Sequence, residues 1–301
     1  MLIEQATPIV EINDAEIDAC GVRLLIKRID LVHPVVSGNK WYKLKYNLQQ
    51  AHQQGQQTLL SFGGAYSNHI HALAGAGRTE GFNTIGVIRG EPHQPLNATL
   101  QYATEQGMHL HYVSRADYRL KNTPQFIANL AERFGPFYLI PEGGSNALAL
   151  AGVKEIIGGI DVPFDFVATA CGTGGTLAGL IAGLQGEHQA LGIAVLKGGD
   201  FINQEVALLL SQAGSAAYSN WKIETDYHFG GYAKTKPELL DFMAEFERQH
   251  AIPLEPVYTA KMFYALFDKI KHGDFARGST IVALHTGGLQ GRASMLASEC
   301  C

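Results

Sequence analysis

Apolar and polar positions alternate along the chain with two different periods. Short apolar runs bounded by turn-forming residues predict β-strands, whereas longer stretches with apolar residues every three or four positions predict α-helices. The runs that predict strands occupy residues 58–62, 84–89, 109–113, 137–140, 166–170 and 281–284. The segments that predict helices include residues 41–54, 69–77, 177–184 and 239–250. This alternation is typical of an α/β protein with parallel sheets covered by helices.

Clusters of glycine follow several of the predicted strands. In open parallel sheets, ligands bind in crevices beyond the carboxyl ends of the strands. The glycine clusters fall where such a crevice is expected. The chain contains no internal repeat, low-complexity tract or Pro/Ser-rich linker. Its 301 residues suffice for about two domains, and without a visible tether we expect the chain to cross between them more than once.

The composition narrows the classes of function. Hydrophobic residues make up 46% of the chain and charged residues 17%, which is typical of a globular protein. A formal net charge of -5 favours neither nucleic acid nor an anionic membrane as a partner. The N-terminus does not resemble a signal peptide, and no run approaches the ~20 apolar residues of a membrane helix.

The cysteines give a further expectation about location. Cys20, Cys171, Cys300 and Cys301 are scattered and form no Cys-x-x-Cys pair, so a disulfide framework or a zinc site is not expected. A reducing, cytoplasmic setting is the simplest one. We expect Cys300 and Cys301 to lie in an exposed terminal tail.

The segment Cys171-Gly-Thr-Gly-Gly-Thr176 joins a predicted strand to an apolar helix. Glycines allow backbone N–H groups to converge on an anion, and the N-terminus of a helix adds a favourable dipole. The segment lacks the Gly-Lys-Ser/Thr ending of a triphosphate-binding loop and the spacing of a dinucleotide fingerprint. A single phosphate group fits it better, although a tight, closely packed turn would produce the same pattern.

A candidate nucleophile is Lys40, the last residue of Ser37-Gly-Asn-Lys40. Gly38 and Asn39 favour a sharp turn, after which Lys40 opens a helix. A positive charge at a helix N-terminus is unfavourable, which lowers the pKa of a lysine and favours its neutral, nucleophilic amine. By itself, a lysine in such a position is more often a solvated surface residue.

Other polar segments follow the remaining strands. Ser67 and Asn68 are ordinary helix-capping residues, but the same geometry can bind a carboxylate. His69 and His71 lie two positions apart and share no helix face, so we expect no metal site. The remaining segments could each be a simple turn, and they are Pro141-Glu-Gly-Gly-Ser-Asn146, Gly231-Tyr232, Pro256-Val-Tyr-Thr259 and His285-Thr-Gly-Gly288.

Together and in this order, the segments resemble the family of 1-aminocyclopropane-1-carboxylate (ACC) deaminase and D-cysteine desulfhydrase, which has the fold of the tryptophan synthase β subunit. The resemblance runs from about residue 30 to residue 290. Its most specific motif is Ser-Gly-Asn-Lys-x-x-Lys-Leu at residues 37–44. Supporting motifs are Gly-Gly-x-x-Ser-Asn at 63–68, Gly-Gly-Ser-Asn at 143–146, Pro-Val-Tyr at 256–258 and His-Thr-Gly-Gly at 285–288.

The resemblance implies a two-lobed α/β enzyme of fold type II that binds pyridoxal 5′-phosphate (PLP) between its lobes. The larger lobe would comprise residues 1–46 plus 155–301, and the smaller lobe residues 47–154. A homodimer is also implied.

The resemblance further implies how PLP is bound. Lys40 would hold PLP as a Schiff base and move protons, and Lys43 would lie near the cofactor phosphate. Asn68 would meet the ring hydroxyl, and Thr259 would approach the pyridine nitrogen. The phosphate-binding loop would consist of Gly172, Thr173, Gly174, Gly175 and Thr176.

The same resemblance implies how the substrate is bound. Ser67, Asn68 and His69 would bind the substrate carboxylate, and Tyr232 and Tyr258 would face the substrate. The catalytic set would therefore be Lys40, Ser67, Tyr232 and Tyr258.

Position 259 bears on the choice of substrate. ACC deaminases resemble Pro-Val-Tyr-Glu here, whereas this chain has Pro-Val-Tyr-Thr259. A carboxylate keeps the pyridine nitrogen protonated and the ring a strong electron sink, and a neutral hydroxyl sustains a weaker one. Opening a cyclopropane needs the stronger sink more than loss of a thiolate does. We therefore expect α,β-elimination of D-cysteine to pyruvate, hydrogen sulfide and ammonia.

Several alternatives stay open. With the same cofactor, the chain could deaminate ACC or eliminate from another small D-amino acid. A more remote alternative is a non-catalytic PLP-binding protein, against which the intact Lys40, Ser67 and Tyr258 argue.

Several departures from the family pattern bear on the substrate. Trp41-Tyr42 replaces the usual small or β-branched residue and arginine between the motif lysines, His69 stands where glutamine is common in ACC deaminases, and Glu142 is unusual before two glycines. The chain is also somewhat shorter than many relatives.

Overall fold

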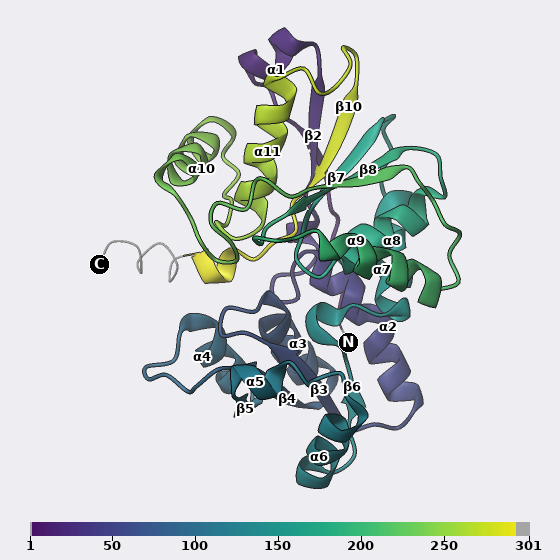
Figure 1. Cartoon of the computed structure of the whole chain (residues 1–301), viewed down its shortest axis with the longest axis vertical. Helices are drawn as coiled ribbons and strands as arrows, with labels where there is room; N and C mark the ends of the chain where they lie inside the picture. Colours follow the sequence, from purple (N-terminus) through teal and green to yellow (C-terminus); the bar gives the residue numbers. More distant parts are fainter. Residues whose placement is uncertain (1, 293–301) are drawn as a thin grey trace.

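The strands form two separate sheets, as the computed structural model of residues 2–292 shows (Figure 1). The larger sheet has the strand order β1-β2-β10-β7-β8-β9. Within the described residues, β1 pairs with β2 in the antiparallel direction and the other neighbours pair in parallel. These strands are β1 (Ile9–Glu11), β2 (Arg23–Lys27), β7 (Phe166–Cys171), β8 (Gln189–Ala194), β9 (Trp221–Glu224) and β10 (Thr280–Leu284).

The smaller sheet has the order β5-β4-β3-β6, and its neighbours all pair in parallel. Its strands are β3 (Thr58–Gly63), β4 (Asn83–Arg89), β5 (His109–Val113) and β6 (Tyr138–Leu139). The central strands β3 and β4 are buried over most of their length, because helices cover both faces of a parallel sheet.

Helices connect the parallel strands. The α-helices are α1 (Ala15–Cys20), α2 (Asn39–Gln53), α3 (Asn68–Glu80), α4 (Ala98–Glu105), α5 (Arg115–Tyr118), α6 (Pro124–Phe134), α7 (Ala147–Gly158), α8 (Gly175–Leu184), α9 (Phe201–Gln212), α10 (Pro237–His250) and α11 (Thr259–Lys271). Short 3-10 helices are η1 (Ile29–Leu31), η2 (Glu142–Gly144) and η3 (Leu289–Gly291). Local sequence explains several of their ends: the Asn146 side chain accepts the N–H of Ala149 and so caps α7.

The predicted elements agree with these bounds. Each of the six predicted strands is present: β3, β4, β7 and β10 each extend one residue beyond the prediction, β5 matches it, and β6 is one residue shorter at each end. The predicted helices correspond to α2, α3, α8 and α10. The expected α/β fold with parallel sheets covered by helices is therefore confirmed.

The larger sheet is covered on both faces. The helices α7, α8 and α9 lie on one face and α1, α10 and α11 on the other (Figure 1). Their apolar side chains pack against the sheet. The smaller sheet packs against α3 and α4 on one side and α5 and α6 on the other. The lobe boundaries near residues 46 and 154 stay a prediction, because α7 spans the second boundary and contacts both α2 and α8.

Two sequence expectations concern membrane-spanning helices and the cysteines. Among residues 2–292, no helix combines the length and the apolar character that crossing a membrane requires. Cys20 and Cys171 are free thiols, and Cys171 is buried. Cys300 and Cys301 lie outside the described residues.

Candidate active site

A cavity of about 590 Å³ lies where the carboxyl ends of strands from both sheets meet. Its wall comes from the start of α2, the β3–α3 and β7–α8 loops, η2, the end of β4, and two tyrosines near α11. The residues named from the sequence that line it are Lys40, Lys43, Ser67, Asn68, His69, Gly172, Thr173, Gly174, Thr176, Tyr232 and Tyr258. Gly175 and Thr259 were named too, but they do not line it.

Lys40 is the second residue of α2 and faces this cavity. The preceding turn requires a glycine, because Gly38 has φ +63° and a Cβ there would lie 1.9 Å from the Thr286 carbonyl oxygen. Burial lowers the pKa of Lys40 to about 8. The direction agrees with the sequence argument, and its cause here is the loss of solvent on burial. Among residues 2–292, the Lys40 amine has no hydrogen-bond or ion-pair partner.

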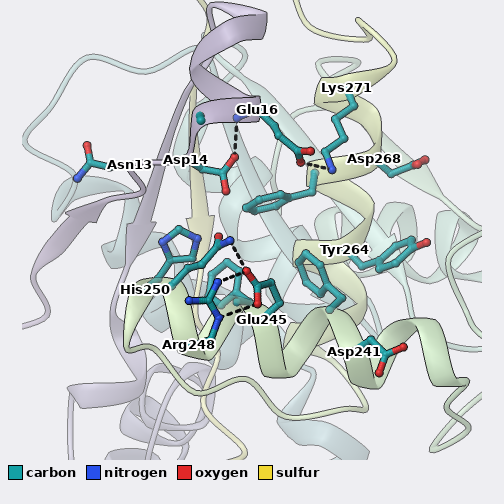
Figure 2. A pocket seen from close by; sticks show the side chains of 15 residues that line it. Asn13, Asp14, Glu16, Asp241, Glu245, Arg248, His250, Tyr264, Asp268 and Lys271 are labelled. Atoms are coloured by element: carbon teal, nitrogen blue, oxygen red, sulfur yellow. Dashed lines mark hydrogen bonds and ion pairs between the residues drawn. The ribbon is translucent and has the colours of Figure 1, made fainter.

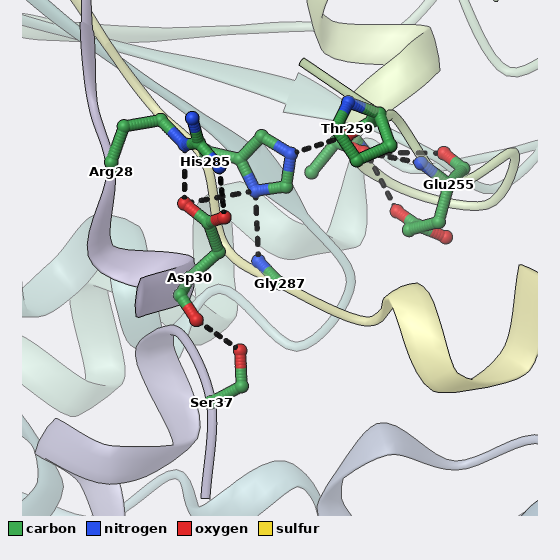
Figure 3. A network of polar contacts seen from close by, with 8 residues as sticks. Arg28, Asp30, Ser37, Glu255, Thr259, His285 and Gly287 are labelled. Carbon is green, nitrogen blue, oxygen red and sulfur yellow. Dashed lines mark hydrogen bonds and ion pairs between the residues drawn. The ribbon is translucent and has the colours of Figure 1, made fainter. Parts of the chain in front are cut away.

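A buried polar network holds the turn before Lys40 in place (Figure 3). The carboxylate of Asp30 accepts two hydrogen bonds from Arg28, at 2.9 and 2.7 Å, and lies 3.4 Å from Nδ1 of His285. His285 is fully buried, and its Nε2 bonds the Pro253 carbonyl at 2.8 Å. The Asp30 carbonyl accepts the Ser37 hydroxyl at 2.8 Å. The network therefore links the end of β2 and the loop after β10 to the start of α2.

The β7–α8 loop meets a buried amine at the N-terminus of α8. Lys43 is only 1% exposed, and its Nζ lies 3.2 Å from the Gly143 carbonyl and 3.3 Å from the Ser145 hydroxyl. Both acceptors are neutral, and both distances are long for a hydrogen bond. Burial and the neighbouring Lys40 hold the pKa of Lys43 well below its ordinary value. An anion at this place would complete the coordination of the amine.

The absence of a side chain at Gly175 lets the Ser145 hydroxyl and the Lys43 amine approach the start of α8. A Cβ there would lie 2.4 Å from the Ser145 hydroxyl and 3.0 Å from Lys43 Nζ. The Ser145 hydroxyl bonds the Thr173 hydroxyl at 2.8 Å, which joins η2 to the loop. Thr176 accepts a hydrogen bond from the Asn39 side chain at 2.7 Å. The hydroxyls of both threonines are thus oriented by partners from other elements.

The start of α3 combines a cap with a buried histidine. The Ser67 hydroxyl oxygen accepts the N–H of Ile70, so Ser67 caps the helix while it lines the cavity. His69 is buried and its Nε2 lies 2.8 Å from the Ser61 hydroxyl, whereas its Nδ1 has no partner among the described residues. Burial, Lys40 and Lys43 lower the pKa of His69 well below its ordinary value. His69 is therefore a neutral donor or acceptor.

Tyr232 and Tyr258 form a hydroxyl pair in the cavity. The Tyr258 hydroxyl donates to that of Tyr232 at 3.3 Å, and their ring centroids lie 6.0 Å apart. Burial raises the pKa of both phenols. Both hydroxyls consequently stay protonated at neutral pH and can donate hydrogen bonds.

Thr259 lies directly behind Tyr258, as the first residue of α11. It is fully buried, and its hydroxyl bonds the Glu255 backbone, accepting the N–H at 2.9 Å (Figure 3). The Glu255 carboxylate accepts the backbone N–H groups of Val257, Tyr258 and Thr259. Burial raises the pKa of Glu255 to about 7.

Four charged cavity residues were absent from the candidate list drawn from the sequence: Arg89, Lys121, Glu142 and Glu205. Arg89 ends a predicted strand, so the rule that ligands bind beyond the carboxyl ends of strands could have identified it. Glu142 was noted only as a departure from the family pattern. Lys121 and Glu205 carry no sequence signal of their own.

A larger groove of about 970 Å³ lies between α1, α10 and α11, away from these residues. Its charged side chains largely neutralise one another (Figure 2). Arg248 pairs with Glu245, and Lys271 pairs with Glu16. This groove presents no buried amine and no glycine loop, so the smaller cavity is the better candidate for chemistry.

The residues of the smaller cavity fit PLP. The fit rests on a buried amine that lacks an anionic partner (Lys43), a glycine loop at the N-terminus of α8 beside that amine, and a second amine without a partner (Lys40). The three features adjoin in one cavity, as the phosphate and the aldehyde of one small molecule require.

Known proteins agree with this assignment. A protein of Pyrococcus horikoshii named "Putative 1-aminocyclopropane-1-carboxylate deaminase" is 32% identical over 287 residues, covering 90% of this chain and 86% of that protein. The D-cysteine desulfhydrase of Yersinia enterocolitica is 29% identical over 315 residues, covering 95% and 92%. The crystal structure of an ACC deaminase homologue superimposes with a TM-score of 0.87 at 30% identity, covering 99% of this chain and 95% of that one.

The family described as pyridoxal-phosphate dependent enzyme matches residues 1–287. With the glycine loop, Lys40 and Lys43 gathered in one cavity, this match over nearly the whole chain means that the protein belongs to the family of pyridoxal-phosphate dependent enzymes.

Proposed function

We propose that this PLP-dependent enzyme is a lyase that eliminates sulfide from D-cysteine and yields pyruvate and ammonia. The observation that carries the proposal is the position of a neutral threonine hydroxyl, rather than a carboxylate, directly after Tyr258. The similarity to a D-cysteine desulfhydrase supports it.

PLP, when bound, supplies the electron sink that makes a Cα proton removable. Lys40 is the residue that would accept this proton, because a pKa of about 8 leaves part of its amine neutral near pH 7. Ser67 and Asn68 lie beside the N-terminus of α3, where a substrate carboxylate is favoured. The protonated hydroxyls of Tyr232 and Tyr258 can donate hydrogen bonds to the departing sulfur.

The choice of substrate follows from the surroundings of Thr259. Its hydroxyl is uncharged, and the nearest carboxylate, Glu255, is turned toward three backbone N–H groups. A pKa of about 7 keeps part of Glu255 protonated near neutral pH, which further limits negative charge here. Such surroundings favour loss of a good leaving group over opening of a cyclopropane.

The direct test is the visible absorption spectrum of the purified protein before and after separate additions of D-cysteine, L-cysteine and ACC. We expect a visible band from bound PLP, with sulfide and pyruvate released from D-cysteine. Lys40→Ala should lose the band, whereas Lys45→Ala should keep it, because Lys45 lies on the same helix but pairs with Glu155 outside the cavity. Product from ACC alone would overturn the substrate assignment.

The role of position 259 is tested by Thr259→Glu, with Thr259→Gln as a control of similar size. We expect Thr259→Glu to lower D-cysteine turnover and to raise ACC turnover. Thr259→Gln should lower D-cysteine turnover without raising ACC turnover. If Thr259→Glu leaves both activities unchanged, the electron-sink argument is wrong.

ACC deamination is the second candidate, favoured by the similarity to the Pyrococcus protein and to the ACC deaminase homologue. The same three-substrate assay separates the two activities, because sulfide arises only from cysteine.

We also propose a cytoplasmic homodimer, on the basis of the resemblance to this family and of the sequence composition. Sedimentation of the purified protein would test the dimer: a mass near twice 32.6 kDa is expected, and a single-chain mass would refute it.

A further inference from the structure

Three charged side chains that line the cavity meet around a buried tyrosine. We call this set the Arg89 cluster: Arg89 at the end of β4, Tyr118 in α5, Lys121 after it, and Glu142 in η2. Tyr118 is 3% exposed, and its hydroxyl donates to Glu142 at 2.8 Å. The guanidinium of Arg89 lies 5.7 Å from the Tyr118 ring centroid, and the amine of Lys121 lies 5.1 Å from it. The buried ring is therefore a fixed platform for two cations.

The two cations differ in how they are neutralised. Lys121 Nζ lies 3.3 Å from the Glu142 carboxylate, so this pair is balanced. Arg89 has no carboxylate or other hydrogen-bond acceptor among residues 2–292. Its guanidinium nevertheless lines the cavity and adjoins the β3–α3 loop, since a Cβ on Gly64 would lie 3.6 Å from Nη2. Besides the amines of Lys40 and Lys43, the cavity thus contains an oriented guanidinium that the protein itself does not neutralise.

Arg89 lies near the residues that are proposed to bind the substrate carboxylate and to face the substrate. The β3–α3 loop that it adjoins leads to Ser67, one of the residues proposed to bind the substrate carboxylate. Its charge also acts on the Tyr232 hydroxyl, whose pKa it lowers against the effect of burial. Arg89 therefore faces the space between the carboxylate loop and the tyrosine pair, where a substrate side chain would extend.

We propose that Arg89 is a specificity-determining residue that binds the β-substituent of the substrate as an anion. The substrate class is then small amino acids whose β-substituent is negatively charged, of which the thiolate of cysteine is the smallest. This inference rests on the proposed elimination reaction and deepens it. The two methylene carbons of the ACC ring carry no charged group, so ACC would gain nothing from Arg89.

Arginine suits this role better than the neighbouring lysine. The guanidinium remains charged at every relevant pH, presents several donors in one plane and stacks on an aromatic ring. Lys121 is already committed to Glu142.

The test uses two ligands of nearly the same shape that differ in charge, aspartate and asparagine, each as the D- and the L-enantiomer. Neither carries a good leaving group, so binding to the PLP-loaded enzyme is read from the change in visible absorption without turnover. We expect aspartate of one enantiomeric series to bind at least about tenfold more tightly than the matching asparagine. Arg89→Gln should abolish this preference by weakening aspartate binding and should change asparagine binding less than about threefold.

Arg115→Gln is the matched control, because Arg115 is an exposed arginine at the start of α5 that does not line the cavity. It should keep the preference for aspartate. Equal affinities of aspartate and asparagine in the unmodified enzyme, absence of binding by both, or a preference that survives in Arg89→Gln would overturn the inference. Failure of the proposed elimination is recognised separately, as absence of sulfide from either enantiomer of cysteine while the preference for aspartate persists.

Discussion

Two regions of this molecule bury a lysine amine, and they satisfy it differently. Lys261, in helix α11, is fully buried and its amine is surrounded by carbonyl oxygens. These acceptors are Val195 at 3.2 Å, His228 at 2.8 Å and Gly231 at 2.8 Å. In the cavity, Lys43 is equally buried but has only two long contacts, to Gly143 and Ser145.

The comparison separates a structural lysine from a binding lysine. Burial lowers the pKa of Lys261 to about 8 and that of Lys43 well below its ordinary value, so both amines are costly to bury. A complete set of carbonyls offsets this cost at Lys261 within the protein itself. At Lys43 the cost is offset only when an anion binds. Burial of a charged residue therefore indicates a ligand site only when its partners are incomplete.

The largest effect is expected at the structural lysine. Lys261→Met removes three hydrogen bonds of a buried amine, although the His228 and Gly231 carbonyls keep a backbone N–H donor, and should lower the free energy of unfolding by about 3 kcal/mol. Urea denaturation of the protein without PLP measures it. The exposed Lys154 of α7 provides the control, and Lys154→Met should change stability by less than about 0.5 kcal/mol. If Lys261→Met were as stable as the unmodified protein, the proposed role of the carbonyls would be wrong.

At Lys43, the binding lysine, we expect a large effect on PLP affinity and no loss of stability. Lys43→Met should raise the dissociation constant of PLP by about 100-fold, because a charge-assisted contact to the phosphate is lost. It should not lower the stability of the PLP-free protein, because methionine fills a similar volume without a buried charge. Titration with PLP and urea denaturation measure the two quantities. A loss of stability with unchanged PLP affinity would erase the distinction between the lysines.

The close packing of Gly175 against Ser145 and Lys43 is tested by a pair of glycines. A Cβ at Gly175 would press on Ser145 and Lys43, so Gly175→Ala should cost about 1–3 kcal/mol of stability and weaken PLP binding. At Gly158, the last residue of α7, nothing lies within 4 Å of such a Cβ. Gly158→Ala should leave PLP binding unchanged and stability within about 1 kcal/mol. If the two variants had equal stability and equal PLP affinity, the close packing at Gly175 would not matter for PLP binding.

The smallest effect concerns Lys40, the cavity lysine without partners. Only the neutral amine attacks the PLP aldehyde, and the neutral form increases as pH rises through the pKa of about 8. The rate of PLP uptake should therefore rise about tenfold between pH 7 and 9 and then level off. A lysine of ordinary pKa would give a rise of about 100-fold without a plateau in this range. Stopped-flow absorption at a series of pH values distinguishes the two.

Much of the fold and of the cofactor site could be predicted from local patterns. The strands of the smaller sheet follow the period of apolar positions, and the glycine loops follow from turn chemistry. The strand β8, which contains Gly192 in its apolar run, was not predicted. That glycine is required by packing, since a Cβ would lie 2.7 Å from Leu177 and 2.8 Å from Cys171.

The sequence by itself determined the α/β class, the PLP loop and Lys40, because these depend on neighbouring residues in a recognisable order. Only the tertiary structure decided which polar groups lose water and which partners they find. It buries Lys43 while Lys45, two positions later, stays partly exposed, and it brings Arg89 and Glu142 to one tyrosine ring. Burial and charge balance depend on contacts between distant segments, which local periodicity does not encode.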